Sequence, residues 1–305
     1  MLDVRRLRLL RDLAQLGTIT AVADAHTYTP SAVSQQLTVL EREAGTRLLE
    51  RTGRRVTLTP AGERLVQHAE KILVALEEAE ADLATTELAG PLRIGAFPTA
   101  VRTLLPSTLV RLARDHPRLD LTVTELDPAD APRELRERRL DVALVNDYDV
   151  MPAVEAGETQ PLLDETVYLA VHGDERSIAD AENSSWIAGT TGTACHAVTL
   201  HACRAAGYSP RIRHTADDFD AVLALVAAGQ GVSLVPQLAA GSPPEGVTLV
   251  PLAIRRRTGV AYRDGARKHP AVAAFVDAVQ DAAATVAHAQ RTGSQPFRRS
   301  AHRAG

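Results

Sequence analysis

The segment from residue 18 to residue 62 constrains the fold most, because it combines two helix patterns, a tight turn and an arginine-rich hairpin. Thr29 is a good N-cap residue and Pro30 is tolerated at a first helical position, so the second helix is expected to begin there. Its inward stripe consists of Val33, Leu37 and Leu40. A supporting helix before it and a hairpin after it suit insertion of a helix into a DNA groove.

The outer face of this second helix carries short or amide side chains where a solvated helix usually has charges. These residues are Ser31, Ser34, Gln35 and Thr38. Hydroxyl and amide groups can form hydrogen bonds with the base edges of the major groove. An ordinary surface helix remains the alternative for this segment taken alone.

Three arginines surround a glycine turn directly after the helix pair, at Arg51, Arg54 and Arg55. Guanidinium groups suit phosphate oxygens, and contacts of that kind position a protein on DNA without reading its sequence. A plain surface turn would tolerate the same arginines. Their place after the two helices favours a backbone contact.

Charge is distributed unevenly along the chain. Residues 1–60 hold nine arginines and six acidic residues, a net charge of +3, whereas residues 61–290 have a net charge of −11. The basic N-terminal part is therefore the expected polyanion surface. The last 15 residues, 291–305, contain four arginines and no acid, and we predict a disordered basic tail there.

With these motifs in order, the chain resembles the LysR-type transcriptional regulators over about residues 4–290. The motifs are T-I-T-A-V-A-D, S-A-V-S-Q-Q-L, L-E-R-E-A-G-T-R-L-L-E-R and V-T-L-T-P-A-G. The resemblance implies an α/β protein with a winged helix-turn-helix at residues 1–59, a linker and dimerisation helix at 60–89 and a two-lobed effector-binding domain at 91–290. It places the following residues in the major groove: Ser31, Ala32, Ser34, Gln35 and Gln36. Arg51, Arg54 and Arg55 would then contact the DNA backbone.

Two positions depart from the family pattern. Pro30 stands where the family often has Gln, which removes one base contact and leaves the operator sequence open. Leu49 stands where Phe is usual, a change of core residue with little functional weight.

Thr59 and Pro60 predict the start of a long helix that runs to about Leu88. Its apolar residues repeat with heptad spacing, which is the period that two helices need to stay in contact. We call these residues the dimer seam: Leu65, Ala69, Ile72, Leu76, Ala79 and Leu83. The seam predicts a homodimer on an inverted-repeat operator, with packing on the chain's own body as the alternative; a tetramer is implied only by the resemblance. We interpret Gly90–Pro91 as a hinge.

Beyond the hinge, short apolar runs alternate with helix patterns, which predicts parallel sheets in an α/β architecture. The resemblance adds that the last strand and helix cross back to the first lobe. Lobe one then spans about residues 91–160 and 264–290, and lobe two about 161–263.

A small effector is expected between the lobes, where strands end and helices begin. The candidates in lobe one are Thr99, Ala100, Asn146 and Asp147, and those in lobe two are Thr190, Thr191, Thr193, Asp217, Asp218 and Phe219. Helix starts rich in Gly and Thr favour an anion, whereas the aspartates favour a cationic or amino-bearing ligand. Simple helix capping is the alternative, and the effector's charge stays open.

The two cysteines, Cys195 and Cys203, fall in one predicted helix, roughly 12 Å apart from the rise per residue. That separation is too long for a disulfide unless the helix melts. Peroxide-sensing members of the family have a cysteine pair in this region with a spacing of nine, so a redox response remains an alternative function. With His196 and His201 the spacing does not place four metal ligands on one helix face, and we expect no metal.

No nucleophile elbow, paired-acid motif or Walker sequence occurs, so we expect a non-enzyme without a cofactor. The N-terminus begins with an arginine-rich amphipathic pattern rather than a signal peptide. This favours a cytoplasmic regulator over a solute-binding protein. The expected partners are promoter DNA, a small effector and a second copy of the chain, with RNA polymerase as a further candidate.

Overall fold

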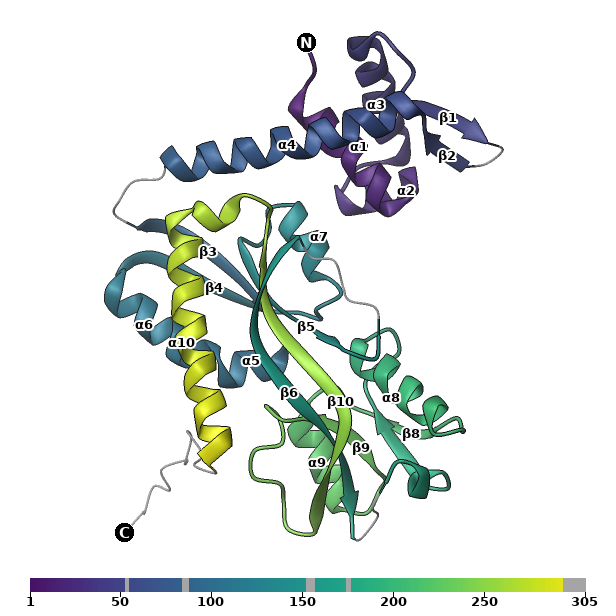
Figure 1. Ribbon diagram of the computed structural model, residues 1–305, viewed down its shortest axis with the longest axis vertical. Helices are drawn as coiled ribbons and strands as arrows, with labels where there is room; N and C mark the ends of the chain where they lie inside the picture. Colours follow the sequence, from purple (N-terminus) through teal and green to yellow (C-terminus); the bar gives the residue numbers. More distant parts are fainter. Residues whose placement is uncertain (53–54, 84–87, 152–156, 174–176, 293–305) are drawn as a thin grey trace. The chain divides into compact units, whose positions relative to one another are not determined.

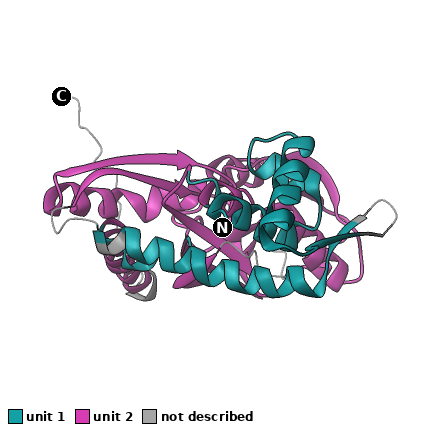
Figure 2. Cartoon of the chain, turned by 90° about the horizontal axis from the view of Figure 1, so that it is seen from above, with its two compact units in different colours: residues 1–86, 136–138, 263–270 teal, residues 87–135, 139–262, 271–305 magenta. Residues whose placement is uncertain are grey.

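The computed structural model describes the chain except for residues 53–54, 84–87, 152–156, 174–176 and 293–305 (Figure 1). The chain divides into two compact units (Figure 2). Unit 1 consists of residues 1–86, 136–138 and 263–270, and unit 2 contains the remainder. Among the described residues, no helix combines the length and the apolar character needed to cross a membrane.

Unit 1 contains four helices and one hairpin among its described residues. They are α1 (Val4–Leu16), α2 (Ile19–Ala25), α3 (Pro30–Ala44), β1 (Leu49–Thr52), β2 (Arg55–Leu58) and α4 (Pro60–Leu83). As predicted, Thr29 caps α3 by accepting the N–H of Ala32, and Gly45 ends the helix in the left-handed region. Leu residues of α1 pack with Val22, Val33 and Leu37 in one core.

Helix α4 begins at Pro60 as expected but ends at Leu83, and Leu88 is not helical. Its first turn lies against the segment before the hairpin. A Cβ atom at Gly62 would lie 2.2 Å from the carbonyl oxygen of Leu48, so only glycine permits this close approach.

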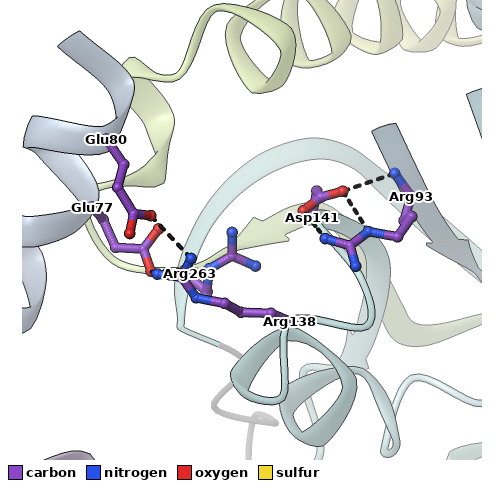
Figure 3. A network of polar contacts seen from close by, with 6 residues as sticks. All are labelled: Glu77, Glu80, Arg93, Arg138, Asp141 and Arg263. Atoms are coloured by element: carbon purple, nitrogen blue, oxygen red, sulfur yellow. Dashed lines mark hydrogen bonds and ion pairs between the residues drawn. The ribbon is translucent and has the colours of Figure 1, made fainter. Parts of the chain in front are cut away.

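Two short later segments also belong to unit 1 and contact α4. The carboxylate of Glu77 accepts hydrogen bonds from Arg138 at 2.6 Å and from Arg263 at 3.2 Å (Figure 3). Glu80 accepts a second bond from Arg138 at 3.0 Å, and Lys268 pairs with Glu78 at 2.9 Å. An arginine–glutamate cluster therefore holds both segments to the linker helix.

Unit 2 has a six-stranded sheet in the order β4-β3-β5-β10-β6-β9 and a smaller sheet of β7 and β8. Its strands are β3 (Ala89–Ala96), β4 (Arg118–Glu125), β5 (Val142–Tyr148), β6 (Glu158–His172), β7 (Ser185–Ala188), β8 (Arg211–Thr215), β9 (Ser233–Pro236) and β10 (Val247–Tyr262). Its helices are α5 (Pro98–Thr103), α6 (Leu105–Asp115), α7 (Ala131–Arg136), α8 (Ala194–Ala205), α9 (Phe219–Ala227), α10 (Pro270–Thr292) and the short 3-10 turn η1 (Ala179–Ala181). A second 3-10 turn, η2 (Ala266–Lys268), lies in unit 1.

Two lobes are recognisable within unit 2, joined by the long strands β6 and β10 (Figure 1). Lobe one contains β3, β4 and β5 with α5, α6 and α10, and lobe two contains β7, β8 and β9 with α8 and α9. Strand β10 pairs with β5, and Arg111 of α6 forms an ion pair with Asp281 of α10. The last strand and helix therefore return to lobe one, as the resemblance implied.

The prediction of parallel sheets is only partly right. Strands β3, β4 and β5 are parallel, and so are β7 and β8, but β5–β10, β10–β6 and β6–β9 are antiparallel. The antiparallel ribbon arises because β6 and β10 pass through both lobes. Gly90 and Pro91 are the second and third residues of β3 rather than a hinge, at a strand start where proline is tolerated.

A buried ion pair joins the two crossing strands. Arg256 of β10 and Glu165 of β6 have side chains only 1% exposed and form two hydrogen bonds of 3.0 and 3.1 Å. The same carboxylate accepts the Thr258 hydroxyl at 3.1 Å and the Leu238 N–H at 2.7 Å. The Arg256 guanidinium also stacks on the ring of Phe97, 5.2 Å from its centroid. In lobe one, Asp141 holds Arg93 of β3 through three hydrogen bonds (Figure 3).

Candidate nucleic-acid interface and effector site

Helix α3 presents an uncharged face to solvent, as predicted. Ser31, Gln35 and Thr38 are exposed, whereas Ala32 and Ser34 are half-buried. The Thr38 hydroxyl donates to the carbonyl of Ser34 at 2.9 Å, so it is partly occupied by its own helix. The face is therefore available for contact, with Gln35 its longest uncommitted side chain.

Gln36, another predicted groove residue, is half-buried beside α1. Its Oε1 accepts a hydrogen bond from Arg6 Nε at 2.9 Å, and the same guanidinium pairs with Glu43 at 2.5 Å. The partners in this network are separated by 30 and 37 positions in the sequence. Local sequence spacing therefore does not predict these hydrogen bonds. Gln36 is thus oriented by Arg6, and its role in DNA contact stays a prediction.

The turn before α3 is held by a buried carboxylate that the sequence analysis did not single out. Asp12 of α1 is fully buried and contacts His26 Nε2 at 2.5 Å and Arg11 Nε at 2.8 Å. Burial raises the pKa of Asp12, but the His26 hydrogen bond and the Arg11 charge outweigh it and hold that pKa below its ordinary value. An acid within the apolar run L-L-R-D-L was the available sequence signal. The contact fixes α1 against the helix-turn-helix.

The hairpin forms where it was predicted, with Arg51 opposite Val56 and Thr52 opposite Arg55. The backbones of Arg51 and Arg55 thus lie on paired strands of the wing. Their side chains and the whole of Arg54 lie outside the described residues, as does the predicted tail beyond Thr292. The phosphate contacts of these arginines remain predictions.

The dimer seam divides into two parts along α4. Ala69 is buried and Leu65 half-buried against the core of unit 1. Beyond them the seam is open: Ile72 is 40%, Leu76 36% and Leu83 83% exposed, and Ala79 is exposed as well. An apolar stripe facing water along a helix is typical of an interaction surface.

In lobe one, two of the predicted effector residues are buried polar side chains. Thr99, in the first turn of α5, is 2% exposed, and Asn146 of β5 is 7% exposed. Neither side chain forms a hydrogen bond with another residue in the described part of the chain. Ala100 is fully buried, and Asp147 is engaged by Arg257 at 2.9 Å.

In lobe two, a threonine-rich loop is held by one aspartate. Asp217 accepts the N–H of Thr190 at 2.7 Å and its hydroxyl at 2.5 Å. Thr193 caps α8 by accepting the N–H of His196, which is the alternative to a ligand contact, and its own hydroxyl donates to the Thr190 carbonyl. Thr191 is exposed. Asp217 thus has a structural task in addition to any ligand contact.

Further acids face one another near this loop. Burial raises the pKa of Asp127, and the nearby charges of Asp130 and Asp217 raise it further. Asp218 caps α9 by accepting the N–H of Ala221. Arg102 of α5 contacts Asp218 at 3.3 Å and also pairs with Asp220, which links the two lobes. Acidic side chains predominate near this loop, and they favour a cationic ligand, whereas the helix starts taken alone favour an anionic ligand.

Phe219 is 8% exposed and packs in the core of lobe two with Val222 and Val235. Its evident task is to anchor the start of α9. Its contact with an effector remains a prediction.

The two cysteines both lie in α8, as predicted. Cys195 is half-buried, with its sulfur 3.6 Å from the Tyr148 hydroxyl, and Cys203 is buried. Burial raises the pKa of Cys195, and it raises the pKa of Cys203 to about 11. Both thiols are therefore protonated at neutral pH. Among the described residues no group of His, Cys, Asp and Glu is arranged to hold a metal ion.

Comparison with known proteins agrees with this architecture. Residues 4–63 match the model of the bacterial regulatory helix-turn-helix protein, lysR family, and residues 85–284 match the LysR substrate binding domain. The chain is 34% identical over 244 residues to a probable hydrogen peroxide-inducible genes activator of Mycobacterium avium, covering 76% of this chain and 77% of that relative. It is 30% identical over 284 residues to the DNA-binding transcriptional dual regulator OxyR of Escherichia coli, covering 87% of this chain and 90% of the relative.

A solved structure is similar along its length. A cysteine mutant of Corynebacterium glutamicum OxyR has a TM-score of 0.58 and 27% identity, with 97% of this chain and 96% of that chain covered. The similarity thus extends over the helix-turn-helix, the linker helix and the α/β body of this chain. The chain belongs to the LysR family of DNA-binding transcriptional regulators and is not an enzyme.

Proposed function

We propose that this regulator binds an inverted repeat in promoter DNA as a dimer, with α3 in the major groove. The observation that carries the proposal is the exposed, uncharged face of α3 at Ser31 and Gln35. The Ser31 hydroxyl forms a hydrogen bond with the Thr29 hydroxyl at 3.0 Å, whereas the Gln35 amide forms none with another described residue. Side chains of this kind read base edges. Ala32, Ser34, Gln36 and Thr38 flank that face, and the wing arginines at 51, 54 and 55 would grip the backbone.

Dimerisation is proposed to use the open part of the seam. Ile72, Leu76, Ala79 and Leu83 leave apolar surface in water along three turns of α4, and a second copy would cover it. Such a pair presents two α3 helices to two half-sites. The same proposal includes a tetramer made of two dimers. It also includes RNA polymerase as a further partner and a cytoplasmic location beside the DNA.

The effector is proposed to bind between the lobes of unit 2. Thr99 and Asn146 are buried polar side chains without a hydrogen-bond partner among the described residues, and such groups are expected to meet a ligand or water. The loop of Thr190, Thr191 and Thr193 would contribute from lobe two, beside Asp217. The ligand is a small molecule with hydrogen-bonding groups.

The DNA proposal is tested by fluorescence anisotropy with DNA from upstream of the gene and its neighbours, against scrambled DNA of equal length. Gln35→Ala is expected to weaken specific binding by roughly tenfold, because a good base contact contributes about 1–3 kcal/mol. Gln15→Ala, an exposed position on α1, is the matched control. Equal affinity of the wild type for both DNAs would refute specific recognition.

The effector proposal is tested on Thr99→Val and Thr190→Val, with Thr124→Val on the exposed part of β4 as the control. Ligand that co-purifies with the wild type is identified by native mass spectrometry. It should be lost from the first two variants and retained by the control. Retention of the ligand by all three variants would show that the Thr99 and Thr190 hydroxyls do not contribute to the effector site.

We infer a second candidate function, a response to peroxide through Cys195. It is favoured by the similarity to the peroxide-inducible activator and to OxyR and by the position of Cys195 beside Tyr148. The raised pKa values of both thiols oppose a fast reaction with peroxide. The helix also separates the two cysteines by roughly 12 Å, which opposes a disulfide between them. Thiol titration before and after mild peroxide tests it: an unchanged count of two thiols would exclude the candidate.

A further inference from the structure

A cavity of about 520 Å³ lies within unit 1, beside the helix proposed to read DNA. It is lined by the first turns of α1, the turn before α3 and one edge of α3. Its lining residues are Asp3, Arg5, Arg6, Arg8, Leu9, His26, Tyr28, Ala32 and Gln36. That volume lies in the range typical of small-ligand sites.

Most of the polar groups in this wall are already engaged. Asp3, the one acid among the nine lining residues, caps α1 by accepting the N–H groups of Arg5 and Arg6. The Arg6 guanidinium is occupied by Gln36 and Glu43, and His26 contacts Asp12. These contacts leave the guanidinium groups of Arg5 and Arg8. Neither forms a hydrogen bond or ion pair with another residue that the structure describes.

Arg8 is the unusual member of this wall. It is half-buried, and burial lowers its pKa; the neighbouring guanidinium groups of Arg138 and Arg11 lower it further. The charges of Glu77 and Asp12 act in the opposite direction but do not restore the ordinary value. A guanidinium group that has lost water without gaining an acceptor costs free energy, and a bound anion would return that energy.

We propose that this cavity binds a phosphate group through the guanidinium groups of Arg5 and Arg8. Two arginine forks supply the paired N–H donors that phosphate oxygens accept. Tyr28, which is exposed and lines the same cavity, adds a hydroxyl donor. The group comes either from the DNA backbone, since Ala32 and Gln36 of α3 line the same cavity, or from free phosphate or a small phosphorylated molecule.

Two assays on the full-length chain distinguish these sources. In the first, inorganic phosphate is titrated by calorimetry at constant ionic strength. In the second, DNA affinity is measured against salt concentration for upstream and scrambled DNA. The variants are Arg5→Gln and Arg8→Gln, with Arg204→Gln as the matched control, an exposed arginine on α8 of unit 2. Arg8→Lys keeps the positive charge but lacks the paired N–H donors of a guanidinium group. It replaces Arg8→Gln in both assays if Arg8→Gln does not fold.

With free phosphate as the source, the wild type and the control bind inorganic phosphate, and each cavity variant binds it at least tenfold more weakly. With DNA as the source, each variant reduces the salt slope by about 0.9 per lost contact, equally for both DNAs. Unchanged phosphate binding together with unchanged slopes would overturn the inference. The DNA assay rests on the proposed function. A wild type without specific DNA binding would refute that function, while the phosphate titration would still decide the cavity.

Discussion

Removing the charge of Glu165 should destabilise unit 2 by several kcal/mol. Its carboxylate and Arg256 are each 1% exposed, and Glu165 accepts four hydrogen bonds from Arg256, Thr258 and Leu238. Glu165→Gln keeps the shape but leaves the guanidinium charge buried without its counter-charge. Breaking such a pair costs about 3–5 kcal/mol.

Urea unfolding followed by tryptophan fluorescence measures this effect in unit 2 itself. The chain has one tryptophan, Trp186, which is fully buried in lobe two. With a slope of about 3 kcal/mol per molar urea, the midpoint should fall by at least about 1 M. Asp164→Asn is the control on the same strand: its pair with Arg255 is exposed, and such pairs contribute about 0–1 kcal/mol.

A double-mutant cycle with Arg256→Met completes the test. Because the two side chains are in contact, the double variant should lose at least about 1 kcal/mol less than the sum of the single losses. A Glu165→Gln loss no larger than that of Asp164→Asn, or strictly additive single losses, would refute the reasoning.

Three further predictions concern the interface, the loop and the core of unit 1. Asp12→Asn should cost about 1–3 kcal/mol of unfolding free energy at pH 7. The pKa of Asp12 is lower in the folded state than in the unfolded state. The stabilisation is therefore present above the unfolded pKa of about 3.9 and is lost as the pH falls through the folded pKa. The acid denaturation curves of the wild type and the variant should converge, and a constant difference between them would contradict this. Ile72→Lys and Leu76→Lys should each raise the dimer dissociation constant at least tenfold in analytical ultracentrifugation, and an unchanged constant would move the interface elsewhere. Asp217→Ala should speed hydrogen exchange at the Thr190 amide by roughly tenfold, because its acceptor is lost; an unchanged rate would show that the loop is held by other contacts.

Local signals predicted the helix-turn-helix closely. The Thr29 cap, the Pro30 start and the Gly45 end of α3 all occur as expected, because caps depend on residues that are neighbours in sequence. The linker helix shows the limit of such signals. The last seam residue, Leu83, is also the last residue of α4, whereas the expected end at about Leu88 lies beyond the helix.

Long-range pairing was beyond single-sequence reasoning. Gly90 and Pro91 resemble a break, but pairing with β4 extends them as a strand. The Glu165–Arg256 pair joins residues 91 positions apart, and no periodicity relates them. The hydrogen bond from Thr190 to Asp217 likewise joins residues 27 positions apart, and the sequence alone indicates Asp217 only as a ligand contact or a helix cap.

Hydroxyl-radical footprinting of the full-length protein on upstream DNA tests the central claim most directly. A dimer that presents two α3 helices should protect two half-sites related by inversion, with centres one helical turn of about 10–10.5 base pairs, or a multiple of it, apart. Gln35→Ala should weaken both half-sites together. Absence of protection, or protection equal on scrambled DNA, would contradict the account.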